Sequence, residues 1–480
     1  MKFNNIIKIA LALGIFASVG SCSEDRLDLY PDTEESLEGK VFTATELQYL
    51  LNNAYGSVGS ASALGANSII YGELMSDNAF ISNTNSGYYT SANAMNFSDA
   101  STEASSTWAQ YYAIIRNANI VIHADVVLEE AASPAVLEIK SQAHIMKGMA
   151  YLMLAQYFSP SPKLGMDSPY GIVLKPNAWD PNDIGVRSTL QETYDAIVSE
   201  LEKGLEHAPD QAEHKGIFTK TLANFLLAKT HLHFGTTDAA NQAAITYANK
   251  VLNESPAAFG LLDAEDYLTY FTSNDEAEQE NQPETIFEVP QTASFNLDVN
   301  AHPATFFANN APHRSILYRP AFRDSFSDDD IRKELFGNNG PGSDDPTGIF
   351  IKKWQRKPAS QGAYTQDIKV FRMTEALFIK WEAMAKLNQN PLNELNAFAQ
   401  SRGGTTYSGD ALTAVLEEKR KEFFGEGTRY YDLKRNGLPI VKETNCVINC
   451  NISADDKLFV FPIPSSEMLR NPGMQQYPGY

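Results

Sequence analysis

Apolar residues recur at helical spacing over most of this chain, and that pattern limits the fold more than any other feature. In residues 107–127, Trp108, Tyr111, Ile115 and Ile122 have the spacing that puts side chains on one face of an α-helix. The same rhythm returns in four later segments, residues 143–157, 190–205, 222–234 and 240–252. Amphipathic helices in such number bury their apolar stripes by packing against one another.

Two of these segments form a pair. Gly235 breaks the chain between residues 222–234 and 240–252, and small residues such as Ala244 and Ala248 allow the two helices to approach closely. The pair looks like one tetratricopeptide-type repeat. A plain antiparallel helix pair is the alternative, because no strict period of 34 residues runs through the chain. We therefore predict a mainly α fold of paired helices in an α-superhelix, with a loop-rich face and minor β structure.

Cap and turn residues define the ends of these helices. Ser188 with Gln191 has the outline of a capping box, and Asp238 is placed to cap the helix after Gly235. Residues 260–365 are rich in Gly, Pro, Asn and Asp and contain the short β-like run Thr285–Val289. We expect long loops there, and long loops in a compact protein tend to carry function.

The N-terminus has the pattern of an export signal. Lys2 and Lys8 precede a short apolar run at residues 9–19 that is too short to span a bilayer. Val19-Gly20-Ser21-Cys22 then resembles a bacterial lipobox, so we expect residues 1–21 to be a lipoprotein signal peptide and Cys22 to carry lipid. An ordinary secretory signal with a chance Cys is the alternative. The acidic residues 22–40 suit a solvated tether.

Charge and cysteine content narrow the function further. The formal net charge of −21 disfavours nucleic-acid binding, although acidity also serves solubility alone. Cys446 and Cys450 remain as an even pair in an oxidising compartment, and a turn brings two such residues within bonding range. They form either a possible disulfide or two free thiols.

Several segments match one known family in order. They are residues 50–55, residues 71–78 (Tyr-Gly-Glu-Leu-Met-Ser-Asp-Asn), residues 108–119, residues 418–435 (Glu-Lys-Arg-Lys-Glu-Phe-Phe-Gly-Glu-Gly-Thr-Arg-Tyr-Tyr-Asp-Leu-Lys-Arg) and the tail Phe461-Pro462-Ile463-Pro464. Together they resemble the SusD/RagB family over roughly residues 22–260 and 285–480. Lys419 and Asn436 depart from the family's usual Arg and Trp. The resemblance implies a SusD-like N-terminal helical region at 41–260 and a RagB/SusD C-terminal region at 285–480, in one compact unit.

The resemblance also implies a function. Such proteins are cell-surface lipoproteins, held to the outer membrane by their lipid anchor, that capture glycan (oligosaccharide) and deliver it to a SusC-like TonB-dependent β-barrel transporter. No enzyme activity, cofactor, metal or nucleic acid is expected. A peptide-binding SusD/RagB-type protein, a surface glycoside hydrolase and a helical scaffold are the alternatives. No zinc-protease, phosphate-loop or serine-elbow motif is present, and Asp328–Asp330 is expected to be a solvated run, since no EF-hand follows it.

The family signature has two interpretations. Its characteristic residues are Arg420, Glu422, Glu426, Gly427, Arg429, Asp432 and Arg435. A catalytic acid/base pair is one interpretation, and a charge network that holds the last helix under the loops is the other. We favour the network, because carboxylates beside several Arg have lowered pKa values, the wrong direction for a general acid at neutral pH.

We predict the ligand site on the loop-rich face. Sugar recognition needs flat rings for C–H groups together with amides, carboxylates and Arg for hydroxyls. Two segments provide that mixture, one with Asp77, Asn78, Tyr88, Tyr89 and Phe97, and one with Phe306, Phe307, Asn309, Asn310, His313, Arg314 and Tyr318, which Trp354 could join. The alternative for each aromatic residue is a ring that only holds its own loop down.

Overall fold

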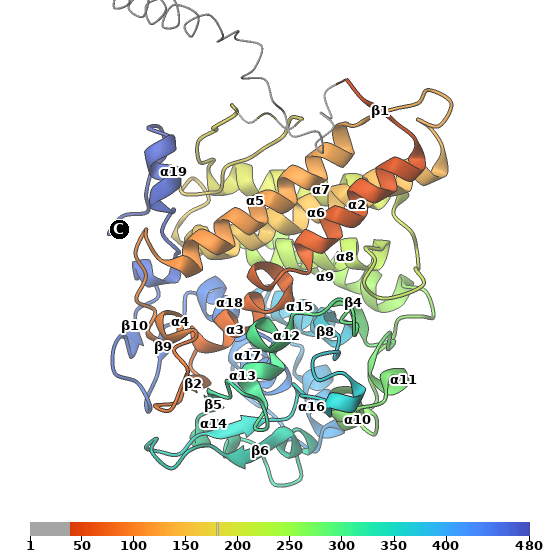
Figure 1. Ribbon diagram of the computed structural model, residues 1–480. Coiled ribbons are helices and arrows are strands. Elements are labelled where there is room, and N and C mark those ends of the chain that lie inside the picture. Colours follow the sequence, from red (N-terminus) through yellow and green to blue (C-terminus); the bar gives the residue numbers. More distant parts are fainter. Residues whose placement is uncertain (1–38, 179, 181) are drawn as a thin grey trace, which may run out of the picture.

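The computed structural model describes residues 39–178, 180 and 182–480. The predicted lipidation site Cys22, the signal peptide and most of the tether lie outside the described residues. The predicted mainly α fold is confirmed (Figure 1). The division of the chain at residues 260 and 285 stays a prediction.

Long helices follow one another in the first part of the chain, and a second group of helices lies in its later part. The helices are α2 (Ala44–Val58), α3 (Asn67–Leu74), α4 (Thr90–Ala94), α5 (Thr102–His123), α6 (Pro134–Phe158), α7 (Leu190–His207), α8 (Lys220–His233), α9 (Asp238–Glu254), α10 (Tyr267–Thr272), α11 (Glu276–Gln279), α12 (Asp298–Ala301), α13 (Ala304–Phe307), α14 (Pro320–Arg323), α15 (Met373–Lys386), α16 (Leu392–Ser401), α17 (Ala411–Glu422), α18 (Arg429–Asn436) and α19 (Ser465–Arg470).

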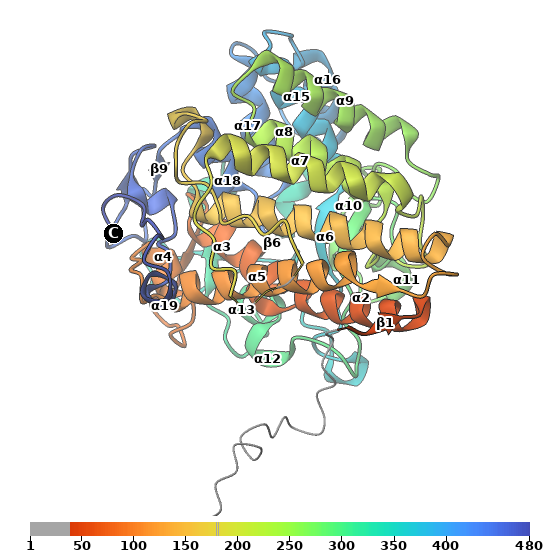
Figure 2. The ribbon, with the colours of Figure 1, turned by 90° about the horizontal axis from the view of Figure 1, so that it is seen from above.

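Consecutive long helices pack side by side in a row. α5 packs on α6, α6 on α7, α7 on α8 and α8 on α9, and α15 then packs against α9 from a distant part of the sequence (Figure 2). Small residues set the spacing: a Cβ atom at Gly148 of α6 would lie 2.8 Å from Leu201 of α7. The row is the superhelix of paired helices that the apolar stripes predicted.

The caps differ from the sequence prediction by one residue. At α7 the capping box is formed by Thr189 and Glu192, each bonded to the other's backbone, and not by Ser188 with Gln191. At α9 Thr237, not Asp238, accepts the cap hydrogen bond. The helix begins where a hydroxyl can reach the third backbone N–H, which fixes the cap one residue away from the expected place.

The strands are all short, and most of them lie in the loop-rich half. They are β1 (Val41–Phe42), β2 (Ala79–Ile81), β3 (Asp125–Val126), β4 (Thr285–Val289), β5 (Ile316–Tyr318), β6 (Phe336–Asn339), β7 (Ile349–Ile351), β8 (Ile368–Arg372), β9 (Ile440–Val441) and β10 (Asn451–Ile452). β2, β5, β7 and β6 form one antiparallel sheet in that order, and β1–β3, β4–β8 and β9–β10 are two-stranded. The expected minor β structure is therefore present, with β4 at the predicted residues.

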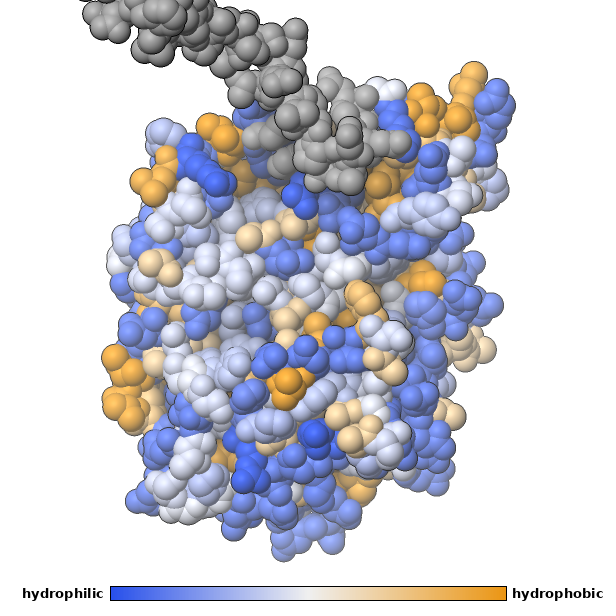
Figure 3. Space-filling model, viewed as in Figure 1, coloured by the Kyte–Doolittle hydropathy of each residue, from blue (hydrophilic) through white to orange (hydrophobic). Residues whose placement is uncertain are grey.

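One large apolar cluster runs through both halves, from Leu47 of α2 to Met474 near the C-terminus. The face in Figure 3 is mostly hydrophilic, with small scattered hydrophobic patches. Within the described part of the chain, no helix is both long enough and apolar enough to cross a bilayer.

Candidate ligand-binding surface

Pairing of β2 with β5 brings the two predicted loop segments together. Ile81 lies opposite Ile316 in the antiparallel register, and the Ser82 N–H donates to the Ser315 carbonyl (2.9 Å), which extends the ladder by one step. The loop that leaves β2 and the loop that enters β5 therefore run side by side. Residues more than 200 positions apart meet at this end of the sheet.

Aromatic rings from both loops touch there. The Tyr88 ring centroid lies 4.8 Å from that of His313 and 5.4 Å from that of Phe306, and Tyr89 lies 4.9 Å from Phe306. Tyr88 is 36% exposed and His313 is half-buried, whereas Phe306 is fully buried beneath them. Phe306 is thus the floor of the cluster, and Tyr88 and His313 are its accessible rings.

Polar groups of the same loops lie beside or follow these two rings. Ser86 Oγ lies 3.2 Å from His313 Nδ1, and the Tyr88 hydroxyl lies 3.5 Å from Asn300 Oδ1. Arg314 is exposed and donates to the Asn309 carbonyl at 3.0 Å. We call the set Ser86, Tyr88, Asn300, Asn310, His313 and Arg314 the Tyr88 surface. Its rings can stack on apolar faces, and its amides and guanidinium can bind hydroxyl groups.

Five predicted ring contacts are wrong, because the rings of Phe97, Phe306, Phe307, Tyr318 and Trp354 are all buried. Phe307 and Tyr318 are 0% exposed and Trp354 is 4% exposed. Tyr318 lies on the core face of β5, where it donates to Glu73 at 2.6 Å, and Trp354 Nε1 donates to the Gly425 carbonyl at 2.7 Å. All three residues of β5 are buried, and the loop-like composition of this segment concealed that strand. Phe97 is also buried and packs on Phe461.

Asp77 and Asn78 hold the structure together: Asn78 is buried and the Asp77 side chain is 13% exposed. Asp77 accepts two hydrogen bonds from Arg429 (3.0 and 2.9 Å), and Asn78 Oδ1 accepts one from Arg420 (2.6 Å). Burial alone would raise the pKa of Asp77, but the bonds and charges of Arg429 and Arg420 lower it to about 2. Their prediction as ligand contacts is corrected, since Asn78 is 0% exposed and the Asp77 carboxylate is bound by arginine.

The family signature forms a buried charge network, as the structural interpretation expected. Arg372 bridges Glu284, Glu422 and Glu426, and Arg435 binds Glu382 and Asp432. Burial alone would raise the pKa of Glu422, but the surrounding cations lower it. Its carboxylate is therefore charged and paired, which is unsuited to a general acid.

Gly427 and Glu73 join the signature to α3. Gly427 has φ = +77°, and a Cβ there would lie 2.7 Å from the Ile69 backbone, so only glycine fits this left-handed close approach. The Gly427 N–H donates to Glu73 (2.8 Å), and burial raises the pKa of Glu73. Sequence reasoning missed the role of Glu73, although the residue lies inside the matched segment 71–78.

A disulfide joins Cys446 to Cys450, with the Cα atoms 5.8 Å apart. The bridge closes the turn between β9 and β10. A cavity of about 390 Å³ separates this turn from the loop that follows β2, and it is lined by residues of both, including Ser82, Asn83 and Cys446. The bridged turn therefore lies next to the loop that carries Tyr88.

Asp330 departs from the expected solvated run. It is 2% exposed and pairs with Arg332 at 2.8 Å, where it caps a 3₁₀ turn at Ile331–Leu335. Among the described residues, no three His, Cys, Asp or Glu side chains gather in a group that could hold a metal ion.

Two family patterns match the sequence. Residues 25–232 match a SusD-like family described as starch-binding and associating with the outer membrane. Residues 328–480 match the SusD family itself, which includes RagB. The chain belongs to the SusD/RagB family. The family model thus agrees with the resemblance seen in the signature and its flanking segments.

Solved structures share the fold of this SusD/RagB protein. A SusD superfamily protein from Bacteroides thetaiotaomicron is 22% identical, with a TM-score of 0.80, and the match covers 91% of this chain and 100% of that one. A putative sugar binding protein from Bacteroides vulgatus is 22% identical, with a TM-score of 0.81 and coverage of 92% and 100%. Surface glycan-binding protein A from Bacteroides fluxus is 19% identical, with a TM-score of 0.69 and coverage of 91% and 99%. The comparison with curated proteins finds no match.

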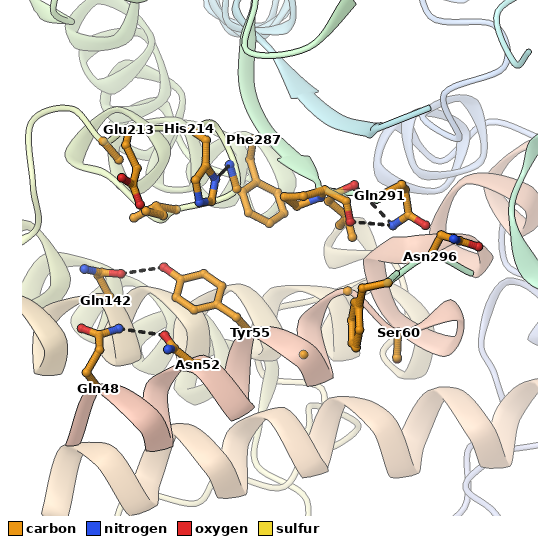
Figure 4. A pocket seen from close by; sticks show the side chains of 18 of the residues that line it. Gln48, Asn52, Tyr55, Ser60, Gln142, Glu213, His214, Phe287, Gln291 and Asn296 are labelled. Carbon is orange, nitrogen blue, oxygen red and sulfur yellow. Dashed lines mark hydrogen bonds between the residues drawn. The ribbon is translucent and has the colours of Figure 1, made fainter. Parts of the chain in front are cut away.

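The SusD/RagB fold here also has a groove that sequence reasoning missed. Its volume is about 1060 Å³, and it lies between α2 and two loops, residues 209–217 and 289–297 (Figure 4). None of its residues belongs to the predicted ligand site. Its amides are dispersed over distant segments, so no local motif could have identified it.

Proposed function

We propose that this SusD/RagB protein is a cell-surface lipoprotein that captures glycan and delivers it to a SusC-like TonB-dependent outer-membrane transporter. The observation that carries the proposal is the Tyr88 surface, where two accessible rings from distant loops lie beside the Ser86 hydroxyl and the Asn300 amide, with exposed Arg314 next to His313 in the chain. That combination suits sugar rings, whose faces are apolar and whose edges carry hydroxyls. The descriptions of the matching family and of two solved relatives as starch-, sugar- or glycan-binding support it.

Binding fits the chemistry of these loops better than hydrolysis does. Glycosidases use two carboxylates that face each other across the sugar. In the neighbouring loop both oxygens of Asp344 already accept hydrogen bonds, from the Ser82 hydroxyl and the Asn83 N–H, each at 2.7 Å. The signature carboxylate Glu422 is buried and paired with arginines.

Calorimetric titration with a panel of oligosaccharides tests the site. We expect Tyr88→Ala and His313→Ala each to weaken binding by about 1–3 kcal/mol, the range measured for ring stacking on planar ligands. Tyr49→Ala is the matched control, because Tyr49 is 66% exposed on α2 and is not part of the surface. Unchanged affinity in both site variants would move the site elsewhere. Cleavage of the sugar would reject the binding function, and selective peptide binding would favour the peptide alternative.

Anchoring is a separate part of the proposal and rests on the lipobox at Cys22. Cys22→Ala should move the protein from the membrane to the soluble fraction. A variant that stays in the membrane with unchanged mass would contradict the anchor.

A further inference from the structure

The groove described above is large enough for a ligand of several units. Small-molecule sites occupy roughly 300–1,000 Å³, and the groove has about 1060 Å³. One wall is α2 with the start of α6, and the opposite wall is the loop 209–217 with β4 and the loop after it (Figure 4). Residues from at least four segments of the chain thus surround one space.

Neutral polar groups dominate its lining. Six side-chain amides border it, those of Gln48, Asn52, Gln142, Gln211, Gln291 and Asn296. Hydroxyls of Tyr55, Ser60 and Ser294 join them, and the ionisable side chains at the border are Glu138, Glu213 and His214, with no Lys or Arg among the described lining residues. An amide both donates and accepts hydrogen bonds, as a sugar hydroxyl does, whereas phosphates and carboxylates need cations. The lining therefore suits an uncharged polyhydroxylated ligand.

Internal hydrogen bonds hold several of these groups in position. The Tyr55 hydroxyl donates to Gln142 Oε1 (2.7 Å) and accepts from the Phe218 N–H (2.8 Å). Gln291 Oε1 accepts from the Leu297 N–H at 2.9 Å. Side chains fixed before binding lose less entropy when a ligand arrives.

Gln48 and Asn52 present further groups one helical turn apart. Gln48 Nε2 donates to Asn52 Oδ1 at 2.9 Å on the surface of α2. Within the described residues, Gln48 Oε1 and Asn52 Nδ2 have no hydrogen-bond partner, so the pair offers one acceptor and one donor to the groove.

An exposed ring stands at the rim. Phe295 is 77% exposed, although its loop is closed by hydrogen bonds from the Thr292 N–H to the Phe295 carbonyl (2.8 Å) and from Asn296 Nδ2 to the Thr292 carbonyl (2.7 Å). The turn holds the ring outward instead of letting it pack inside. A fixed, accessible ring beside amides is the pairing that stacks on a sugar face.

We propose that this groove is a second glycan-binding site, distinct from the Tyr88 surface, that takes a neutral oligosaccharide with Phe295 stacked on one sugar. The ligand class rests on the proposed function. The segment that carries Phe295 continues to Asn300 of the Tyr88 surface, so one loop borders both sites.

Titration of the full protein with neutral and acidic hexasaccharides tests the proposal. The neutral probes are linear hexasaccharides of glucose, xylose and mannose, and the acidic probe is a hexagalacturonate. We expect Phe295→Ala to lower the affinity for at least one neutral probe about five- to hundredfold. Asn52→Trp, which fills the groove from an exposed position, should lower the affinity for the same probe. In the parent protein, binding of that probe should slow hydrogen exchange at residues 211–217 and 291–297.

Two controls separate this site from the other. Tyr49→Ala, which removes another exposed ring, on α2, should leave affinity unchanged. Tyr88→Ala should leave the slowed exchange at 291–297 in place. Binding lost in the groove variants but kept in Tyr88→Ala supports the groove and rejects the Tyr88 surface.

Three results would overturn the proposal. The first is unchanged affinity in both groove variants. The second is a preference of the groove for the acidic probe or for a neutral peptide. The third is that no neutral probe binds at about 10 mM, a concentration that would reveal even millimolar dissociation constants.

Discussion

The helix row α5–α9 and the charge network around Arg372 are both buried, but different forces hold them. In the row, apolar side chains interdigitate, and Leu222, Leu226 and Leu227 of α8 are all 0% exposed. In the network, Arg372 pairs with Glu284, Glu422 and Glu426. Its side chain is 1% exposed, and the side chains of the three glutamates are 0%, 0% and 8% exposed, in that order. The first region is held by area removed from water and the second by matched charges.

The difference predicts how each region responds to damage. An apolar core loses stability in proportion to the atoms removed and the cavity left behind. A buried ion pair loses much stability in one substitution, because removal of one partner leaves the other charged, unpaired and out of water. Three substitutions test whether the two regions differ in this way.

The largest loss is expected at Arg372. Arg372→Met leaves the carboxylates of Glu284, Glu422 and Glu426 without this cation and should lower the free energy of unfolding by about 3–5 kcal/mol. Urea unfolding followed by circular dichroism measures it. Arg323→Met is the control, since Arg323 pairs with exposed Asp324 at the surface, and it should change stability by less than about 1 kcal/mol. A loss below about 1 kcal/mol for Arg372→Met would mean that the two regions do not respond differently to substitution.

A cavity in the helix row should cost somewhat less. Leu226→Ala removes a fully buried side chain and should lower the free energy of unfolding by about 3 kcal/mol. The same urea titration applies, with Leu128→Ala as the control because Leu128 is 87% exposed. Equal effects of both leucine substitutions would mean that the row is not packed as described.

The smallest effect is expected at the edge of the network and depends on pH. The folded-state pKa of Asp77 is about 2, below its ordinary 3.8, so Asp77 stabilises the fold above pH 4 and loses this contribution as pH falls towards 2. The difference of almost two pH units corresponds to about 2 kcal/mol. Asp77→Asn should therefore be less stable than the parent at pH 6, by that amount, and most of this difference should be gone at pH 2.5.

Stability curves for both proteins between pH 2.5 and 7 measure this difference. Asp324→Asn, at an exposed carboxylate, should run parallel to the parent throughout. A gap between Asp77→Asn and the parent that does not narrow on acidification would mean that the Arg429 contact does not hold Asp77 charged.

Local patterns predicted the secondary structure well where one face of a helix is apolar. The segments at 143–157, 190–205 and 240–252 lie inside α6, α7 and α9, and the segment at 222–234 extends one residue beyond α8. The capping residues were harder to predict from the sequence, since the hydroxyl of Thr189 or Thr237 competes with neighbouring polar residues for the same N–H groups. The signature residues were also correctly expected to form a charge network, because their charges alternate in sign within one short stretch.

The sequence by itself determined the helical superstructure and the family, because both depend on residues near one another in the chain. The tertiary structure alone decided which loop residues reach solvent. Tyr88 and Tyr318 occupy similar aromatic, polar segments, yet pairing of β2 with β5 leaves the first at the surface and buries the second against Glu73. Burial depends on contacts between distant segments, and so do the partners of Asp77 and the walls of the groove, which is why a one-dimensional pattern could not place them.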